Sequence, residues 1–460
     1  MPISNFIKLY KFQLLLVLSS LLFYWAFAYN LVRTDSIKLL MLYTALFVVF
    51  YKLIQLTKHN FQLLTWFAFG FRAIFILAIP NLSQDFYRFI WDGRMILEGF
   101  NPYLFTPESF ISLNKFPVSQ AQELYSGMGF LNASHFTNYP PLNQLCFVIA
   151  GVLAGKSILG SVVVLRLIII AADFGVLHYG KKLLKQFKLP EQLIFWYILN
   201  PFIIIELTGN LHFEGVMLFF LIWSLYLLEK NKWQWAAVVF ACSVSVKLIP
   251  LVFLPLLFRW FRKRNSADSN IQESDKIDLF KLLSFYGIVG ITTICVFLPF
   301  YSSEFLTNYT NTVALWFQNF EFNASFYYIF REIGFWISGY NQIAIIGKLT
   351  AIFIFLFVIS LAIYKKPKNT KQLIAAMLIA LTVYYFLATT VHPWYVATLV
   401  LLGLFTNYKF PLVWSFMIIF SYLAYANSVN SENLWIIAFE YIIVFSVFLH
   451  DIFKPNSLET

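Results

Sequence analysis

Long apolar runs, separated by short polar segments, are the feature that most constrains this chain. Clear examples are residues 12–29, 37–56 and 343–364. A run of about 20 apolar residues is long enough to cross the hydrocarbon core of a bilayer as a helix. Residues of apolar type make up 60% of the chain and charged residues only 12%, which excludes an ordinary soluble domain. The sequence therefore predicts an all-α, polytopic transmembrane helical bundle with about 13–14 spans.

The basic residues predict the orientation of these helices. Lysine and arginine gather at 181–188, 259–264 and 365–371. Short loops rich in these residues stay in the cytoplasm, so the net charge of +11 reports topology and not nucleic-acid binding. We predict a single domain over 1–460, with a retained first helix that enters from the cytoplasmic side. The large first extracytoplasmic loop is then 81–139, and a second one is 301–341.

Two apolar segments do not fit a simple crossing. Residues 142–153 are too few to span comfortably, and we expect a re-entrant or interfacial helix there. Residues 233–258 are too many for one crossing and too few for two full ones, and Lys247 and Pro250 interrupt them. We predict a broken hairpin with Lys247 at its outer tip.

The first large loop opens with two carboxylates and two arginines: Asp85, Arg88, Asp92 and Arg94. On a helix, the first three of these lie on one face, and we expect both arginines to neutralise Asp92. Such a cluster, next to a membrane surface, is typical of either a base beside a phosphate site or a salt-bridged helix that anchors the loop.

Other ionisable residues lie at turns that the predicted topology places on the same membrane face. They are His212 and Glu214 at one turn, Lys247 at the next, and His392 at a third. Ionisable groups at the membrane are costly, which favours a functional interpretation, although polar turns and snorkelling lysines are the ordinary alternative. Within one span, we expect Arg166 and Asp173 to form a structural polar pair. We give less weight to Glu206, which lies near the same outer turn as His212.

One carboxylate with nearby cations suits the transfer of a sugar from a lipid phosphate. The phosphate is already a good leaving group, so that this reaction needs one base and no general acid. A hydrolytic glycosidase would need a second carboxylate to protonate its leaving group.

Five short motifs resemble, in this order, the GT-C superfamily of membrane glycosyltransferases, especially polyprenyl-phosphate-mannose-dependent mannosyltransferases and their glycosyltransferase-family-87-like relatives. The motifs are Asp85-x-x-Arg88-x-x-Trp91-Asp92-Gly93-Arg94 with Gly99-x-Asn101-Pro102-Tyr103, Tyr139-Pro140-Pro141-Leu142, Asn200-Pro201 with Glu206 and the turn 209–215, Lys247-x-x-Pro250, and His392-Pro393-Trp394-Tyr395.

The resemblance implies a polyprenyl-phosphate sugar donor, a lipid or glycan acceptor, and a site on the extracytoplasmic side of the cytoplasmic membrane. It makes Asp85 the catalytic base. It assigns substrate binding to the remaining site residues, which are Arg88, Asp92, Arg94, Tyr139, His212, Glu214, Lys247, His392, Trp394 and Tyr395. No Asp-x-Asp triplet is present, so neither a metal nor another cofactor is expected.

Two features depart from the family pattern. The family turn often reads His-Asn-Asp, whereas this chain has His212-Phe213-Glu214, and three helices precede the acidic motif where many relatives have one. The sequence predicts an inverting transferase, with mannose as the expected sugar. Two alternatives stay open, namely a transporter or flippase of a lipid-linked substrate and a non-catalytic protein of envelope-glycan assembly.

Overall fold

The computed structural model describes residues 3–261, 276–318, 320–427 and 430–454, and these are predominantly helical. The only pairing of β type among them is an isolated bridge between Phe322 and Thr390. Contacts within the chain divide it into two compact units. The single transmembrane domain over 1–460 stays a prediction. The first unit comprises 1–137, 144–215 and 393–460, and the second comprises 138–143 and 216–392.

The prediction of a polytopic helical membrane protein is confirmed. Seven helices in the described residues are long and apolar enough to cross a membrane, or up to eight if one bent pair of helices counts as a span. Five shorter apolar helices accompany them. The seven are Tyr10–Asn30, Ser36–Thr57, Ile158–Gln186, Leu279–Phe300, Ile343–Tyr364, Thr370–Leu387 and Leu434–Phe453.

The first unit begins with three packed helices, α1 (Ile3–Asn30), α2 (Ser36–Thr57) and α3 (Phe61–Ile74). Asp35 and Asn60 cap α2 and α3 by accepting a hydrogen bond from the backbone N–H three residues on, which satisfies a free donor of the first turn. These caps explain why each helix begins directly after a short polar turn.

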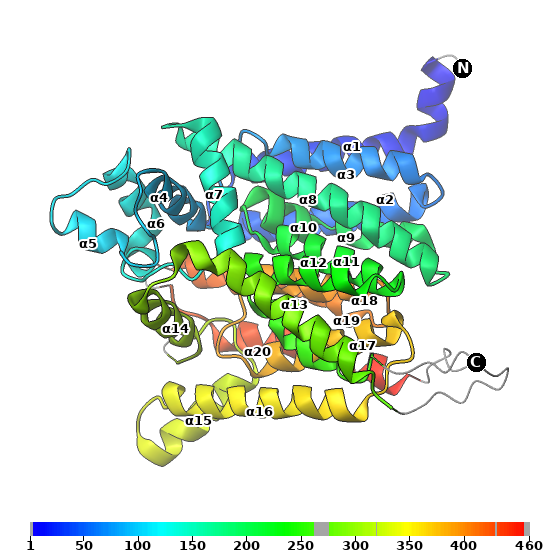
Figure 1. The fold of residues 1–460 in the computed structure, drawn as a ribbon. Coiled ribbons are helices and arrows are strands. Elements are labelled where there is room, and N and C mark those ends of the chain that lie inside the picture. Colours follow the sequence, from blue (N-terminus) through cyan, green and yellow to red (C-terminus); the bar gives the residue numbers. More distant parts are fainter. Residues whose placement is uncertain (1–2, 262–275, 319, 428–429, 455–460) are drawn as a thin grey trace. The chain divides into compact units, whose positions relative to one another are not determined.

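The predicted first outer loop folds into three helices, α4 (Asp85–Leu97), α5 (Pro107–Ile111) and α6 (Ala121–Ala133). Helix α6 packs against both others, as Figure 1 shows. Helix α7 (Pro141–Ala154) comes next and covers the apolar segment that was expected to be re-entrant or interfacial. A Cβ on Gly93 would lie 2.3 Å from the carbonyl oxygen of Phe147, so only glycine lets α4 approach α7 this closely.

The centre of the first unit consists of the long helix α8 (Ile158–Gln186) and a bent segment that packs on it. The segment runs through η1 (Glu191–Ile194), α9 (Phe195–Ile198), α10 (Pro201–Ile203) and the π-helical η2 (Ile204–Gly209), with a bend of 51° at its break. Asn200 and Pro201 form the break, because Pro201 supplies no N–H and the Asn200 side chain caps the start of α10.

Two buried polar residues of α8 do not form the pair that the sequence predicted. Asp173 instead pairs with Arg72 of α3, with Nε and Oδ2 2.7 Å apart. Arg166 donates to the carbonyl oxygens of Ile76, Thr208 and Gly209. The expected Arg166–Asp173 pair is wrong because each side chain finds a buried partner on another element, which spacing along one helix cannot reveal.

The first unit closes with five elements from the end of the chain. Short η5 leads into α18, then α19 and η6, which packs on α2, and finally α20. Their bounds are Pro393–Tyr395, Val396–Gly403, Phe410–Met417, Ile418–Ala426 and Leu434–Phe453.

In the second unit, α12 (Trp233–Val246) packs on α13, and it ends where the sequence predicted a break. Lys247 has extended backbone angles (φ −149°, ψ 143°), and the 3₁₀-helical η3 (Ile249–Leu257) comes after it. The remaining elements are α11 (Glu214–Glu229), α13 (Leu279–Phe297), η4 (Leu298–Phe300), α14 (Ser303–Gln318), α15 (Phe326–Ser338), α16 (Ile343–Tyr364) and α17 (Thr370–Leu387).

One basic cluster from the sequence lies partly outside this description. Arg259 is included, whereas Arg262, Lys263 and Arg264 and the polar segment after them, up to residue 275, lie outside the described residues.

Candidate functional site

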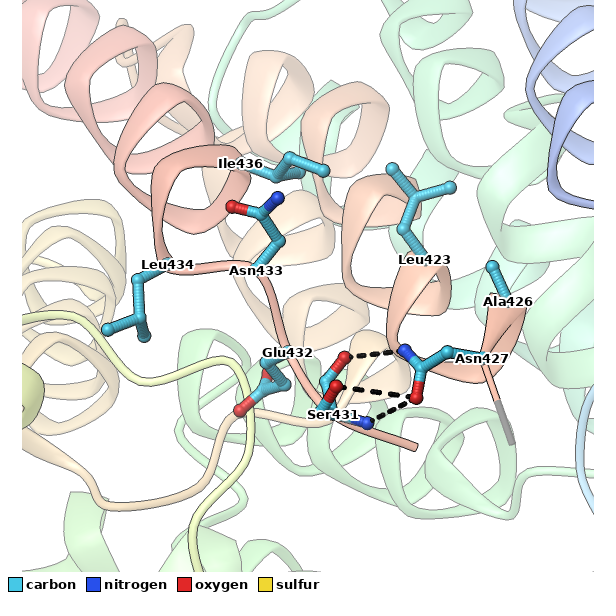
Figure 2. A pocket seen from close by; sticks show the side chains of 8 residues that line it. All are labelled: Leu423, Ala426, Asn427, Ser431, Glu432, Asn433, Leu434 and Ile436. Atoms are coloured by element: carbon cyan, nitrogen blue, oxygen red, sulfur yellow. Dashed lines mark hydrogen bonds between the residues drawn. The ribbon is translucent and has the colours of Figure 1, made fainter. Parts of the chain in front are cut away.

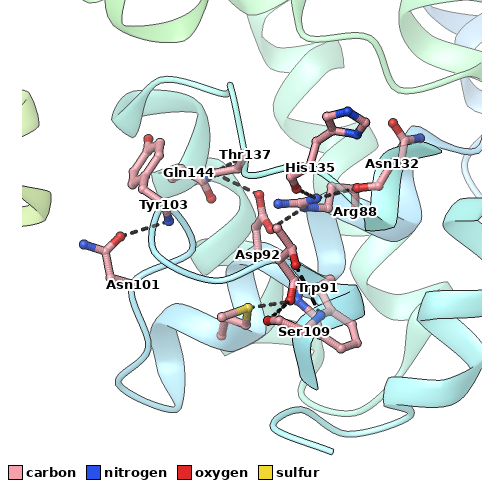
Figure 3. Close-up of polar contacts among 12 residues, drawn as sticks. Arg88, Trp91, Asp92, Asn101, Tyr103, Ser109, Asn132, His135, Thr137 and Gln144 are labelled. Carbon is pink, nitrogen blue, oxygen red and sulfur yellow. Dashed lines mark hydrogen bonds and ion pairs between the residues drawn. The ribbon is translucent and has the colours of Figure 1, made fainter. Parts of the chain in front are cut away.

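Helix α4 brings the acidic motif together as predicted. Asp85 is its first residue, and Arg88 and Asp92 lie further along the same face. Nε of Arg88 lies 2.7 Å from Oδ1 of Asp92, and Nε2 of Gln144 donates to Oδ2 of Asp92 at 3.1 Å (Figure 3). Thr137 receives a second hydrogen bond from the same Gln144 nitrogen. Gln144 of α7 therefore ties Asp92 of α4 to Thr137 in the segment before α7.

Arg88, which the sequence analysis assigns to substrate binding, makes several contacts within the protein. Its side chain is buried, and Nη1 donates to the carbonyl oxygens of Asn132 and His135 at 2.6 and 2.8 Å (Figure 3). With Nε on Asp92, most of its donor capacity is used within the protein. Arg88 thus fixes the loop after α6 against α4, which is a positioning role.

Asp85 and Asp92 differ in solvent exposure, and this decides which of the two carboxylates a substrate can reach. Asp92 is fully buried at 0% exposure, whereas Asp85 is half-buried. Nδ2 of Asn132 donates to Oδ1 of Asp85 at 3.2 Å, which orients the carboxylate from the end of α6. Asp85 is the accessible base candidate of the motif.

Arg94 lies at the other end of α4 and faces away from Asp92. Nη1 donates to the carbonyl oxygen of Ser119 at 2.7 Å and to Oε1 of Gln120 at 3.2 Å. Burial lowers the pKa of this guanidinium, and the nearby Glu123 opposes that shift. The expectation that Arg94 helps to neutralise Asp92 is not met, because the helix turn carries it to the loop before α6.

A second polar cluster of the first unit surrounds His212. This side chain is buried and stacks on Trp394, with ring centroids 3.6 Å apart and an interplanar angle of 20°. Its Nε2 lies 3.7 Å from Oε2 of Glu206, and the hydroxyl of Tyr422 donates to both carboxylate oxygens of Glu206 at 2.8 and 3.0 Å. Three segments far apart in sequence therefore meet at one buried carboxylate.

The backbone before His212 is shaped for this cluster. Leu211 has a φ of +63°, a left-handed conformation that costs a branched residue strain unless its surroundings enforce it. Arg166 supplies part of that support by holding the carbonyl oxygens of Thr208 and Gly209. Oδ1 of Asn210 accepts a hydrogen bond from the N–H of Leu82 at 3.2 Å. This last contact links the turn directly to the segment that begins α4.

Two further predicted residues flank this cluster. Glu214 is buried and begins α11, and its charge acts on the buried Tyr197 of α9. Tyr395 is half-buried, and its ring meets that of Trp394 edge-on with centroids 6.1 Å apart. Glu214 is thus set into the protein at the end of the turn, whereas Tyr395 retains some accessible surface.

The second unit contains the other three predicted residues. Lys247 and His392 interact electrostatically, and the rings of Phe320 and Phe322 lie beside His392 with centroids 5.8 and 5.3 Å from it. Burial, and to a smaller degree the Lys247 charge, lower the pKa of His392 to about 3. His392 is therefore a neutral imidazole at pH 7 and not a cation. Tyr139, the third residue, is half-buried.

A hollow of about 610 Å³ opens between the end of η6 and the start of α20. Figure 2 shows Asn427 held by the backbone and hydroxyl of Ser431 on one side of it. None of the residues predicted from the sequence lines this hollow. Its lining residues are Leu423, Ala426, Asn427, Ser431, Glu432, Asn433, Leu434 and Ile436.

A family of known proteins matches more than half of this chain. Residues 12–262, more than half of the chain, match the family model described as alpha-(1->6)-mannopyranosyltransferase, N-terminal domain. The chain belongs to this family. The match includes the acidic motif of α4 and the His212 turn, whereas Trp394 and Tyr422 lie beyond the matched residues.

Two curated relatives come from Corynebacterium glutamicum. Alpha-(1->6)-mannopyranosyltransferase A is 24% identical over 191 residues, which cover 40% of this chain and 35% of the relative. Alpha-(1->6)-mannopyranosyltransferase B is 26% identical over 159 residues, which cover 34% of this chain and 25% of the relative. The chain thus spans between a quarter and about a third of the length of the relatives that it matches.

Sequence reasoning undervalued or missed several residues that the structure brings to these clusters. Glu206 was given little weight, yet it is the carboxylate on which His212 and Tyr422 converge. A carboxylate inside an apolar run was the available signal. Asn132 and Gln144 carried no such signal, because single amides in polar loops or at helix starts are common, and only the fold brings them to Asp85 and Asp92.

Proposed function

We propose that this protein is an inverting glycosyltransferase that moves mannose from a polyprenyl-phosphate donor to a lipid or glycan acceptor on the outer face of the cytoplasmic membrane. One observation carries the proposal: Asp85 is a partly exposed carboxylate at the start of α4, while the charge of the buried Asp92 is neutralised by Arg88. A single available base is what this transfer requires. The family of alpha-(1->6)-mannopyranosyltransferases supports mannose as the sugar.

In the proposed step, Asp85 accepts the proton of the acceptor hydroxyl while that oxygen attacks the anomeric carbon of mannose. The bond from this carbon to the phosphate oxygen breaks, and its electron pair leaves with the polyprenyl phosphate. A single displacement inverts the anomeric configuration. The hydrogen bond from Asn132 to Oδ1 orients the carboxylate of Asp85.

We assign the remaining residues of α4 to positioning. Asp92 and Arg88 hold α4 to the loops that surround Asp85, and Arg94 holds the loop before α6. Among the other predicted residues, His212, Glu214, Trp394, Tyr395 and Tyr139 remain proposed sugar or lipid contacts. Aromatic rings suit the apolar face of a sugar ring, and polar groups suit its hydroxyls.

Lys247 and His392 remain our proposed contacts to the donor phosphate. Lys247 supplies a positive charge at a helix break, where its backbone is extended. His392 supplies a neutral N–H donor in this state, since its pKa lies well below 7. The departing phosphate would be stabilised by both kinds of donor as charge builds on the leaving oxygen.

The reaction can be tested with purified protein, polyprenyl-phosphate mannose and an acceptor lipid, by measuring released polyprenyl phosphate. Asp85→Asn keeps the shape but cannot accept a proton, so we expect transfer to fall by about 10²- to 10⁴-fold while donor binding persists. Glu98→Gln, an exposed carboxylate at the other end of α4, is the matched control and should keep full activity. Near-normal transfer by Asp85→Asn would show that Asp85 is not the base. Transport of intact donor without release of polyprenyl phosphate would favour a flippase.

The proposed orientation has its own test. Ser109→Cys in the first large loop and Lys368→Cys after α16 both replace exposed residues. In a background without the three native cysteines, an impermeant thiol reagent added outside intact cells should label the first and not the second. Labelling of both from the same side would contradict the outward-facing loop.

A further inference from the structure

Helix α15 carries an apolar stripe on its exposed face. Phe330, Ile333 and Ile337 recur at the spacing of one helix face, and Ile329 and Trp336 flank them. All five side chains are exposed, Trp336 by 86% and Ile337 by 80%. An exposed apolar surface of this extent marks a binding face for a protein or a membrane.

The opposite face of α15 is fixed to its own unit. Tyr327 and Tyr328 are buried, and α15 packs on α16 and α17. The hydroxyl of Tyr327 donates to Oε2 of Glu321 at 2.7 Å, and Nη1 of Arg331 donates to Oε1 of the same carboxylate at 2.8 Å. Because one face is anchored by this carboxylate, the apolar stripe is held outward by the fold.

Helix α16, the next element along the chain, indicates what covers this stripe. Helix α15 ends at Ser338, and the apolar span α16 begins at Ile343, so α15 lies next to the end of a membrane-crossing helix (Figure 1). Helix α16 also exposes apolar side chains along its length, among them Leu349 and Phe353. The exposed stripe of α15 therefore continues a lipid-facing surface.

The length and residue types of α15 specify how it meets the bilayer. Its 13 residues extend about 20 Å, which is too short to cross a hydrocarbon core of about 30 Å. Trp336, together with Tyr340 just after the helix, is of the aromatic type that prefers the boundary between lipid and water. The exposed Glu332 lies beside the stripe, at the edge that would face the headgroups.

We propose that α15 is an interfacial helix that lies in the plane of the membrane surface, with the stripe Phe330–Ile333–Ile337 in the lipid and Glu332 toward water. The partner is the phospholipid bilayer itself, at the end of α16.

This placement has a structural consequence within the second unit. The segment that precedes α15 pairs with the segment that precedes His392, since the N–H of Phe322 donates to the carbonyl oxygen of Thr389 and the N–H of Val391 to that of Phe322. Ser325, the residue before α15, donates to the carbonyl oxygen of Phe386. Helix α15 therefore anchors to the bilayer the loop whose phenylalanines contact His392.

Spin labelling of the full-length protein in phosphatidylcholine–phosphatidylglycerol liposomes tests the proposal. Single cysteines at Ile333, Ile337 and Glu332 are labelled in a background without native cysteines, and collision with oxygen is compared with collision with a water-soluble nickel chelate. We expect the ratio of oxygen to nickel accessibility to be several-fold higher at Ile333 and Ile337 than at Glu332. The Glu332 label is the internal control, because it lies on the same helix.

Two outcomes would overturn the proposal. Nickel accessibility at Ile333 and Ile337 equal to that at Glu332 would place the stripe in water. Dipolar broadening between labels at Ile337, lost on dilution with unlabelled protein, would show that a second copy covers the stripe. Only variants that elute like the wild-type protein in gel filtration are compared. A result at Ile333 or at Ile337 alone is enough to decide between these outcomes and the proposal.

Discussion

Removal of the Arg88 guanidinium should destabilise the protein more than removal of any other charge on α4. Arg88→Met keeps the apolar stem of the side chain, but it leaves the carboxylate of Asp92 buried at 0% exposure with Gln144 as its hydrogen-bond donor. An unpaired buried charge of this kind costs about 3–5 kcal/mol. At roughly 2 °C per kcal/mol for a large chain, the apparent melting temperature should fall by about 6–10 °C.

The same helix provides the control for this prediction. Arg94→Met loses hydrogen bonds to the neutral oxygens of Ser119 and Gln120 and leaves no buried charge behind. Two such bonds are worth about 1–3 kcal/mol in total. The double variant Arg88→Met with Asp92→Leu removes both charges and should recover much of the stability that Arg88→Met loses.

Thermal unfolding of the purified protein in detergent, at one fixed scan rate, measures these differences. An Arg88→Met variant whose melting temperature falls by less than about 2 °C would refute the reasoning, since it would mean that Asp92 is solvated or protonated at little cost. A double variant less stable than Arg88→Met alone would refute it as well, because Asp92 would then stabilise the fold even without Arg88.

Three further predictions concern the other polar residues. Tyr422→Phe removes both hydrogen bonds to the buried Glu206 and should lower stability by about 1–3 kcal/mol in the same melting assay, whereas an unchanged melting temperature would mean that another donor replaces the hydroxyl. Lys247→Ala should slow transfer by about one to two decades and weaken donor binding without a change in melting temperature, and unchanged kinetics would reduce Lys247 to a helix-end lysine. Because the pKa of His392 is about 3 in the folded protein and about 6.5 in the unfolded chain, the stability that it contributes is complete above about pH 6.5 and is lost as the pH falls toward 3. His392→Asn should flatten the decline of the melting temperature over that range, and an unchanged pH profile would contradict the low pKa.

The sequence determined the features that depend on local pattern. Apolar runs long enough to cross a bilayer predicted the membrane helices, because the thickness of the hydrocarbon core sets their length. Lys247 and Pro250 marked the end of α12, since a proline is poorly tolerated inside a helix and the chain before it favours an extended conformation. The spacing of Asp85, Arg88 and Asp92 predicted one helix face, and the acidic motif with its companions indicated the family that the comparison confirmed.

Only the tertiary structure decided which polar groups are partners. Asp173 pairs with Arg72, 101 residues away, and not with Arg166 on its own helix. Glu206 meets Tyr422 across 216 residues. A buried polar group must find a partner wherever the fold supplies one, and helix spacing restricts only the partners on the same helix. The exposure of Asp85 and the burial of Asp92 likewise arise from the packing of α6 and α7 around α4, which the local sequence does not encode.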